Sequence, residues 1–132
     1  MIIPIIVQQA ATIAGVSANL LFSVCMVETG LENKNSFNDG HGRGSLGYCQ
    51  VSVEVARHFK PEADRIALQQ PGYNLLVAGL YLQELMGKYK NNIYSSVSAY
   101  NAGLAWWDEE KHEYKNQNYV NKVMNIYSKL EN

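Results

Sequence analysis

The chain has 132 residues, of which 47% are hydrophobic and 17% are charged. This mixture is typical of a folded chain with enough apolar surface for one core, and it excludes a disordered protein. Its 11 Lys and Arg residues against 12 Asp and Glu residues give a net charge of −1 without a basic run, so no binding to nucleic acid is expected.

The first 27 residues, Met1 to Val27, carry no charge. A secretory signal peptide would open with Lys or Arg, and a membrane-spanning helix needs about 20 mostly apolar residues. This segment has neither property, so we expect two helices of one soluble domain over residues 1–132, without a signal peptide or membrane insertion, and a monomer. The apolar run is interrupted by Gln8, Gln9, Thr12, Gly15, Ser17, Asn19 and Ser23.

Apolar residues at helical spacing, together with residues typical of helix ends, predict an all-α fold with at most a small β element. Pro4 near the start and Gly15 after the end delimit the first helix, and Ser17 is a candidate N-cap for the second. The longest irregular stretch, residues 33–47, is rich in Gly and Asn, and loops of this length tend to be functional. A short strand or hairpin is expected at most within residues 48–55. The predicted helices span residues 4–14, 18–29, 53–58, 74–89, 93–102 and 119–130.

Cys25 and Cys49 are the only cysteines. They form no CxxC pair and no Cys/His spacing typical of a metal site. We expect free, partly buried thiols, and neither a metal nor a cofactor. A catalytic Cys–His pair with one of the three histidines has no supporting local motif. The histidines in question are His41, His58 and His112.

Glu28 is the first candidate for chemistry. It lies near the end of the second predicted helix, on the row that contains Leu21 and Cys25. Apolar neighbours and the negative end of the helix dipole both raise the pKa of a carboxyl group. A carboxyl with a raised pKa keeps its proton near neutral pH and can act as a general acid. On this pattern alone, an exposed or salt-bridged glutamate is the commoner alternative.

Five short motifs occur in a fixed order along residues 5–127. This series resembles the soluble lytic transglycosylase family and its lysozyme-like relatives, which include goose-type lysozymes. The resemblance implies a mainly helical lysozyme-like domain that acts on the glycan strands of bacterial peptidoglycan. The motifs are ETG at 28–30, GYCQV at 47–51, PGYNLLVAGLYL at 71–82, AYNAG at 99–103 and YVNKV at 119–123.

The resemblance also implies roles for single residues. Glu28 matches the single catalytic glutamate of the family, and Thr29 stands where serine is usual. Tyr48 and Cys49 replace the usual Leu-Met, and we expect them to fill the core. Substrate-binding roles are implied for Thr29, Gln50, Tyr100, Asn101 and Tyr119.

With one carboxylate, the implied reaction is cleavage of the β-1,4 bond between N-acetylmuramic acid and N-acetylglucosamine, leaving 1,6-anhydromuramoyl ends. Asp39 leaves an alternative open, because goose-type lysozymes place a second carboxylate in this loop to assist water. Asp39-Gly40 is also typical of a plain turn, which is the favoured interpretation. A third alternative is a non-catalytic wall-binding or structural protein on the same scaffold.

The sequence leaves alternatives for the roles of four further residues and for the place where the protein acts. Trp106 and Trp107 either stack on a sugar or pin their loop to the last helix. His41 and Arg43 either contact peptide or lactyl carboxylates or are solvated loop residues. We expect a bacteriophage lysin or virion component, or a periplasmic enzyme whose leader has been removed.

Overall fold

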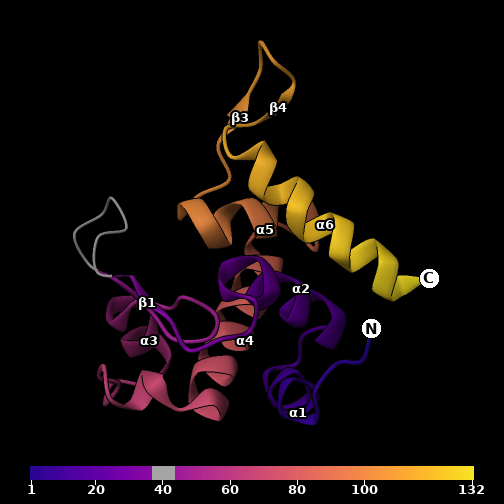
Figure 1. Cartoon of the computed structure of the whole chain (residues 1–132). Coiled ribbons are helices and arrows are strands. Elements are labelled where there is room, and N and C mark those ends of the chain that lie inside the picture. Colours follow the sequence, from indigo (N-terminus) through magenta and orange to yellow (C-terminus); the bar gives the residue numbers. More distant parts are fainter. Residues whose placement is uncertain (37–43) are drawn as a thin grey trace.

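The computed structural model describes residues 1–36 and 44–132, and the chain in these ranges is mainly helical (Figure 1). This confirms the predicted fold class. A short 3₁₀ helix, η1 (Ala67–Gln69), which the periodicity does not reveal, precedes the longest helix. The α-helices are α1 (Ile5–Ala14), α2 (Ala18–Thr29), α3 (Val53–Phe59), α4 (Pro71–Lys88), α5 (Ile93–Ala102) and α6 (Gln117–Glu131).

Capping residues explain where the helices begin and end. The Ser17 hydroxyl accepts a hydrogen bond from the Leu20 N–H at the start of α2, as expected for an N-cap. Gly30 ends α2 with a φ of +72°, a left-handed conformation that costs glycine little. Helix α4 begins three residues earlier than the prediction of 74–89, because Pro71 has the fixed φ that suits a first helical turn.

Two small antiparallel hairpins complete the fold. Strands β1 (Asn35–Ser36) and β2 (Ser45–Leu46) pair with each other, and β3 (Trp107–Asp108) pairs with β4 (Glu113–Tyr114). Within residues 48–55, where a short strand or hairpin was expected at most, the structure has a single bridge from Val51 to Leu46, and both hairpins lie elsewhere. Residues 47–50 form a turn, and α3 begins at Val53.

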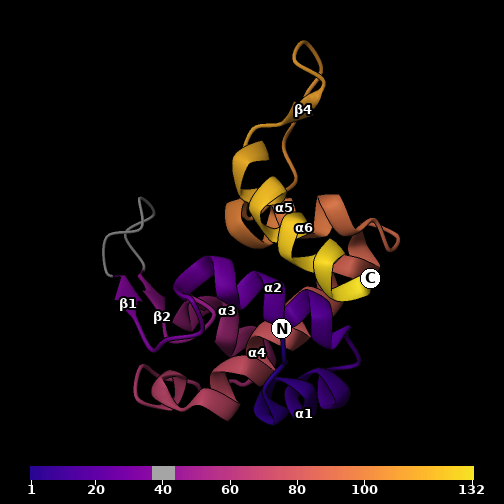
Figure 2. The same ribbon diagram turned by 45° about the vertical axis from the view of Figure 1, so that its right-hand side comes forward.

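Helix α2 packs against three other helices. Figures 1 and 2 show it between α6 on one side and α1 and α4 on the other. Its residues Leu20, Leu21 and Val24 are fully buried, so apolar surface surrounds the helix that carries Glu28. Helices α1 and α4 pack closely because Gly79 leaves room for Ala14, whose Cβ would lie 2.9 Å from an added Cβ.

Cys25 and Cys49 form a disulfide, with their Cα atoms 4.4 Å apart. The prediction of free thiols was therefore wrong, although both residues are fully buried. Cys49 lies in the turn of residues 47–50, and this turn packs against α2 through tertiary contacts. A sequence separation of 24 residues gives no sign of that proximity.

Across the described ranges, no single helix combines the length and apolar character needed to cross a membrane. Helices α1 and α2 meet that test only as a pair, and the pair is bent by 119°.

Candidate active site

A groove of about 730 Å³ lies where the end of α2, the β1–β2 hairpin, the start of α3 and the end of α5 meet. Four of the residues that line it were expected at the site from motifs that lie far apart in the sequence. These four are Glu28, Gln50, Tyr100 and Asn101. The lining residues are Glu28, Ser36, Ser45, Gln50, Val51, Ser52, Val55, Tyr81, Tyr100, Asn101, Ala102 and Gly103.

Glu28 lies one residue before the end of α2 and is partly buried. Burial raises the pKa of its carboxyl group from 4.5 to about 7, and a hydrogen bond from Tyr119 opposes part of that rise. Desolvation has this effect because it disfavours the charged form. With this pKa a substantial fraction of Glu28 is protonated at neutral pH, as a general acid requires.

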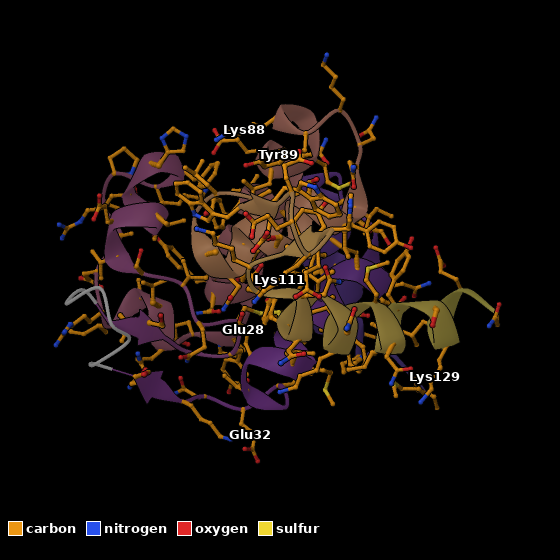
Figure 3. All side chains as sticks on the ribbon, turned by 90° about the horizontal axis from the view of Figure 1, so that it is seen from above. Glu28, Glu32, Lys88, Tyr89, Lys111 and Lys129 are labelled. Carbon is orange, nitrogen blue, oxygen red and sulfur yellow. A yellow bond between two sulfur atoms is a disulfide. The ribbon has the colours of Figure 1, made fainter. Side chains whose placement is uncertain are left out.

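Tyr119 reaches Glu28 from the first turn of α6. Its hydroxyl donates to Glu28 Oε2 at 2.7 Å, and Figure 3 shows Glu28 beside the beginning of that helix. Burial, followed by the charge of Glu28, raises the pKa of Tyr119 well above its ordinary value. The phenol thus stays protonated and remains a donor to the carboxylate.

Tyr100 projects from α5 into the same region. Its hydroxyl donates to the carbonyl oxygen of Cys49 at 2.7 Å, and its ring lies 5.3 Å from that of Tyr81 on α4. Burial, with a smaller contribution from the charge of Glu28, raises the pKa of Tyr100 well above its ordinary value. Tyr100 therefore joins α5 to the turn of residues 47–50 and supplies an aromatic wall of the groove.

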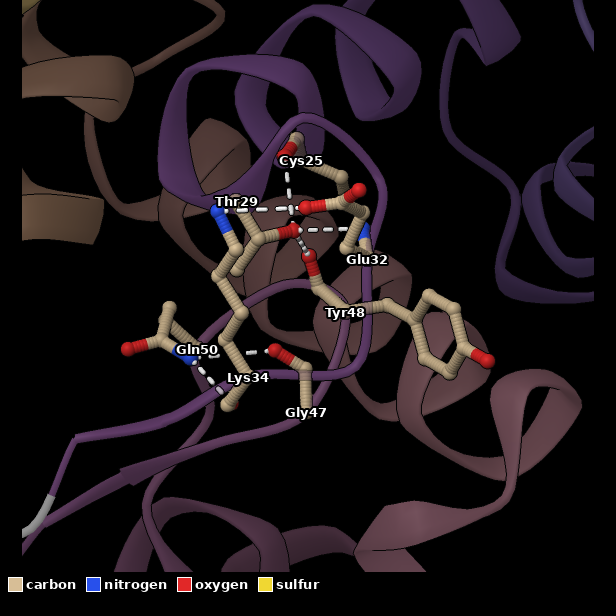
Figure 4. Close-up of polar contacts among 7 residues, drawn as sticks. All are labelled: Cys25, Thr29, Glu32, Lys34, Gly47, Tyr48 and Gln50. Atoms are coloured by element: carbon tan, nitrogen blue, oxygen red, sulfur yellow. Dashed lines mark hydrogen bonds and ion pairs between the residues drawn. The ribbon is translucent and has the colours of Figure 1, made fainter.

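Gln50 occupies the end of that turn with a φ of +53°, an uncommon conformation for a residue with a side chain. Its Nε2 donates to the carbonyl oxygens of Lys34 at 2.7 Å and Gly47 at 3.0 Å (Figure 4). These bonds tie the turn to the segment that leads into β1. Gln50 is thereby held in one orientation at the groove.

Asn74, fully buried on α4, holds the other side of the turn. Its Oδ1 accepts from the Cys49 N–H at 2.9 Å, and its Nδ2 donates to the Leu46 and Leu68 carbonyls at 2.8 and 2.9 Å. A Cβ on Gly47 would lie 2.3 Å from this nitrogen. Only glycine fits there, so Gly47 and Asn74 together fix the path of the turn.

Thr29 does not line the groove; it is buried at the end of α2. Its hydroxyl donates to the Tyr48 carbonyl at 2.7 Å and accepts from the Glu32 N–H at 2.9 Å (Figure 4). Like the Cys25–Cys49 disulfide, it fastens the end of α2 to the turn. The structure thus gives Thr29 contacts with the backbone, where the family resemblance implied a substrate-binding role.

Asn101, exposed on the last turn of α5, is held from outside the groove. Asn116, the residue before α6, donates from Nδ2 to Asn101 Oδ1 at 3.0 Å. Asn116 also bonds twice to Ser98, donating to its carbonyl at 3.0 Å and accepting from its hydroxyl at 2.6 Å. Ser98 is fully buried, so this network anchors Asn101 to the core.

Glu28 is the one carboxyl group among the described residues that line the groove. Asp39, the candidate second carboxylate, lies outside the described residues, as do His41 and Arg43. Within residues 1–36 and 44–132, no group of three or more His, Cys, Asp or Glu side chains is arranged to hold a metal ion.

Trp106 and Trp107 lie at the β3–β4 hairpin, each about half exposed. The Trp107 ring packs edge-on against Tyr114 at 5.0 Å, and Lys115 Nζ lies 5.6 Å from the centre of the Trp106 ring. Both rings therefore have contacts within the hairpin and keep surface exposed to solvent.

Sequence reasoning missed several residues that build the site. Tyr81 and Asn74 lie within the quoted PGYNLLVAGLYL segment, but helical periodicity gave no reason to single them out. Asn116 had no signal, because its partners Ser98 and Asn101 lie in another helix. Ser36 and Ser45, which also line the groove, had no signal either.

Comparison with known proteins identifies one family. The model of the Transglycosylase SLT domain matches residues 5–123, nearly the whole chain. A search of curated proteins finds no match. The family implies a peptidoglycan substrate and action at the cell wall, which agrees with the motif order and with the groove around a glutamate of raised pKa. The chain belongs to the Transglycosylase SLT domain family.

Proposed function

We propose that this protein is a lytic transglycosylase that cleaves the β-1,4 bond between N-acetylmuramic acid and N-acetylglucosamine, with Glu28 as its acid and base. The observation that carries the proposal is the setting of Glu28. It is the one described carboxyl group in a groove of about 730 Å³, and burial raises its pKa to about 7. The cavity has the size of a binding site for a small ligand or sugar.

The first step uses the protonated form of Glu28. Its carboxyl group donates a proton to the glycosidic oxygen as the bond from that oxygen to C1 of the muramoyl residue breaks. The acetamido group of the same sugar supports the positive charge that develops at C1, which replaces the second carboxylate of most glycosidases. The Tyr119 hydroxyl, 2.7 Å from Glu28 Oε2, stabilises the carboxylate left behind.

The second step returns the proton. The C6 hydroxyl of the muramoyl residue attacks C1 and gives its proton to the Glu28 carboxylate. One C–O bond has then been broken and another formed, no water has been consumed, and Glu28 is protonated again. The product carries a 1,6-anhydro ring.

Mass spectrometry of muropeptides released from purified sacculi tests the reaction type. Without a water added at each cut, the muramoyl products are about 18 Da lighter than the products of hydrolysis. We expect the lighter products. Reducing-end muramic acid as the main product, lost in Asp39→Asn, would instead establish a hydrolytic muramidase.

Replacement of Glu28 tests its role. We expect Glu28→Gln to keep the fold and to lower the rate of wall lysis by roughly 10²- to 10⁴-fold, the usual contribution of a general acid. Glu32→Gln is the matched control, because this exposed carboxylate lies four residues away and pairs with Lys34 on the surface. Lysis by Glu28→Gln within tenfold of the wild type would refute the assignment, and a wild-type chain that binds sacculi without cutting them would establish a wall-binding protein.

The buried disulfide bears on where the enzyme acts. Disulfides persist in oxidising compartments and are rare in the cytosol. The Cys25–Cys49 bond therefore supports action at the cell wall from outside the cytoplasm. A bacteriophage lysin, a virion component and a periplasmic enzyme all meet this condition, and a monomer remains our expectation.

A further inference from the structure

The carboxamides of Asn101 and Gln50 line the same groove, and each is fixed by hydrogen bonds to the protein. A carboxamide has an acceptor oxygen and a donor nitrogen of nearly the same shape, so the orientation follows from its partners. At both positions the network includes a backbone carbonyl, which can only accept. The atom that each amide offers to a ligand can therefore be assigned.

Asn116 determines the orientation of Asn101. The side-chain nitrogen of Asn116 is identified because it lies 3.0 Å from the Ser98 carbonyl oxygen, which can only accept a hydrogen bond. The side-chain oxygen of Asn116 accepts from the Ser98 hydroxyl at 2.6 Å. The second N–H of this nitrogen points to Asn101 at 3.0 Å. A donor requires an acceptor opposite, so the Asn101 atom that faces Asn116 is Oδ1.

The nitrogen of Asn101 is then left for the groove. In residues 1–36 and 44–132, no protein acceptor bonds to Asn101 Nδ2, and the side chain is exposed. Asn101 therefore presents N–H donors to whatever enters the groove.

Gln50 has the opposite polarity. Both N–H groups of its Nε2 are used by the carbonyls of Lys34 and Gly47, as Figure 4 shows. The remaining atom, Oε1, has no donor partner among the described residues. Gln50 therefore presents an acceptor to the groove.

We propose that Asn116 is a positioning residue that makes Asn101 a hydrogen-bond donor, and that Asn101 and Gln50 recognise acetamido groups of the glycan. An acetamido group carries a carbonyl acceptor, which suits Asn101, and an N–H donor, which suits Gln50. A glucosamine residue without its acetyl group lacks the carbonyl and carries a cationic amine. The inference rests on the proposed function for the identity of the ligand as a glycan of acetamido sugars.

The test compares kcat/KM on N-acetylated glycan strands with kcat/KM on chemically N-deacetylated strands. The wild type is expected to prefer the acetylated strands. In Asn116→Asp the side chain cannot donate to Asn101 Oδ1, so the orientation of the Asn101 amide is no longer fixed. We expect kcat/KM on acetylated strands to fall about tenfold, the value of one good hydrogen bond, with little change on deacetylated strands.

Asn118→Asp is the matched control. It makes the same change of charge two residues away at an exposed position on α6, and it should keep the wild-type preference. Asn116→Ala serves as the second variant if Asn116→Asp does not fold, as judged by circular dichroism. The expected loss of preference is the same, because alanine also cannot donate.

Equal losses on both substrates in the Asn116 variants would show a merely structural role and overturn the proposal, as would a wild type without preference. Calorimetric titration separates this proposal from the catalytic one. In a Glu28→Gln background, oligomers of N-acetylglucosamine should bind about tenfold more weakly after Asn116→Ala, whereas glucosamine oligomers should not. Unchanged binding of both would refute the proposal even if cleavage is confirmed, and the expected result would support it even if cleavage fails.

Discussion

The Tyr119 hydroxyl donates a 2.7 Å hydrogen bond to Glu28 Oε2 across a sequence separation of 91 residues. This bond favours the carboxylate, while burial favours the neutral acid. The two effects together set the pKa of Glu28 at about 7, with burial the larger. The proposed mechanism requires these two properties: a carboxyl group that can protonate a leaving group at neutral pH, and a hydrogen bond that stabilises the carboxylate formed.

The pH profile of kcat/KM should report this balance. We expect activity to fall above about pH 7 as Glu28 loses its proton. Tyr119→Phe removes the bond that lowers the pKa, so the alkaline limb should move to higher pH by roughly one unit, while the rate below it falls. An unchanged limb in Tyr119→Phe would contradict the coupling. Tyr127→Phe, a tyrosine bonded to Glu131 on the far end of α6, is the control.

The stability of the fold should depend on the same proton. The folded-state pKa of Glu28 lies above the unfolded value, so the stability that the neutral acid contributes is present below pH 4.5 and is lost as the pH rises through about 7. A rise from 4.5 to about 7 corresponds to at most roughly 3 kcal/mol in the free energy of unfolding.

Glu28→Gln should therefore be more stable than the wild type at pH 8 and about equal to it at pH 4. Urea unfolding at both values measures the difference, with Glu32→Gln as the control that should follow the wild type. A stability difference between Glu28→Gln and the wild type that does not vary with pH would show that the carboxyl is not desolvated in the folded state.

Loss of the Cys25–Cys49 disulfide should destabilise the chain. The bond closes a loop of 24 residues in the unfolded state, for which the chain-entropy model gives roughly 3 kcal/mol. We expect that loss in a Cys25→Ser, Cys49→Ser double variant, measured by denaturant unfolding. Because both sulfurs are buried, reductant should expose thiols in the native wild type only slowly. Rapid thiol release without unfolding would contradict the buried position.

Gly47→Ala should disrupt the site. The added Cβ would lie 2.3 Å from Asn74 Nδ2, at a φ of +75°, and overpacking together with backbone strain costs roughly 3 kcal/mol or more. Activity should fall together with stability, because the distorted turn carries Gln50. Gly87→Ala in α4 is the control. No atom lies within 4 Å of its added Cβ, so it should be neutral or stabilise by about 0.5–1 kcal/mol. Equal effects of the two substitutions would refute the close approach of Asn74.

The local features of this protein could be predicted from its sequence. Apolar periodicity and capping residues placed the helices, because these signals act over a few neighbouring residues. They also placed Glu28 at the end of an apolar helix, from which its raised pKa followed. The order of motifs then indicated the family, and the matching domain model over residues 5–123 confirmed it.

Only the tertiary structure decided what surrounds Glu28. Three interactions join segments that are distant in sequence. They are the hydrogen bond from Tyr119 to Glu28, the Cys25–Cys49 disulfide, and the hydrogen bond from the Cys49 N–H to Asn74. Such pairings depend on how α2, α4 and α6 pack. Packing is driven by burial of apolar surface, which is non-directional, so the periodicity of the sequence does not show which polar side chains will meet. The orientation of the Asn101 amide likewise depends on Asn116, whose own orientation is fixed by hydrogen bonds to Ser98 that form only in the folded chain.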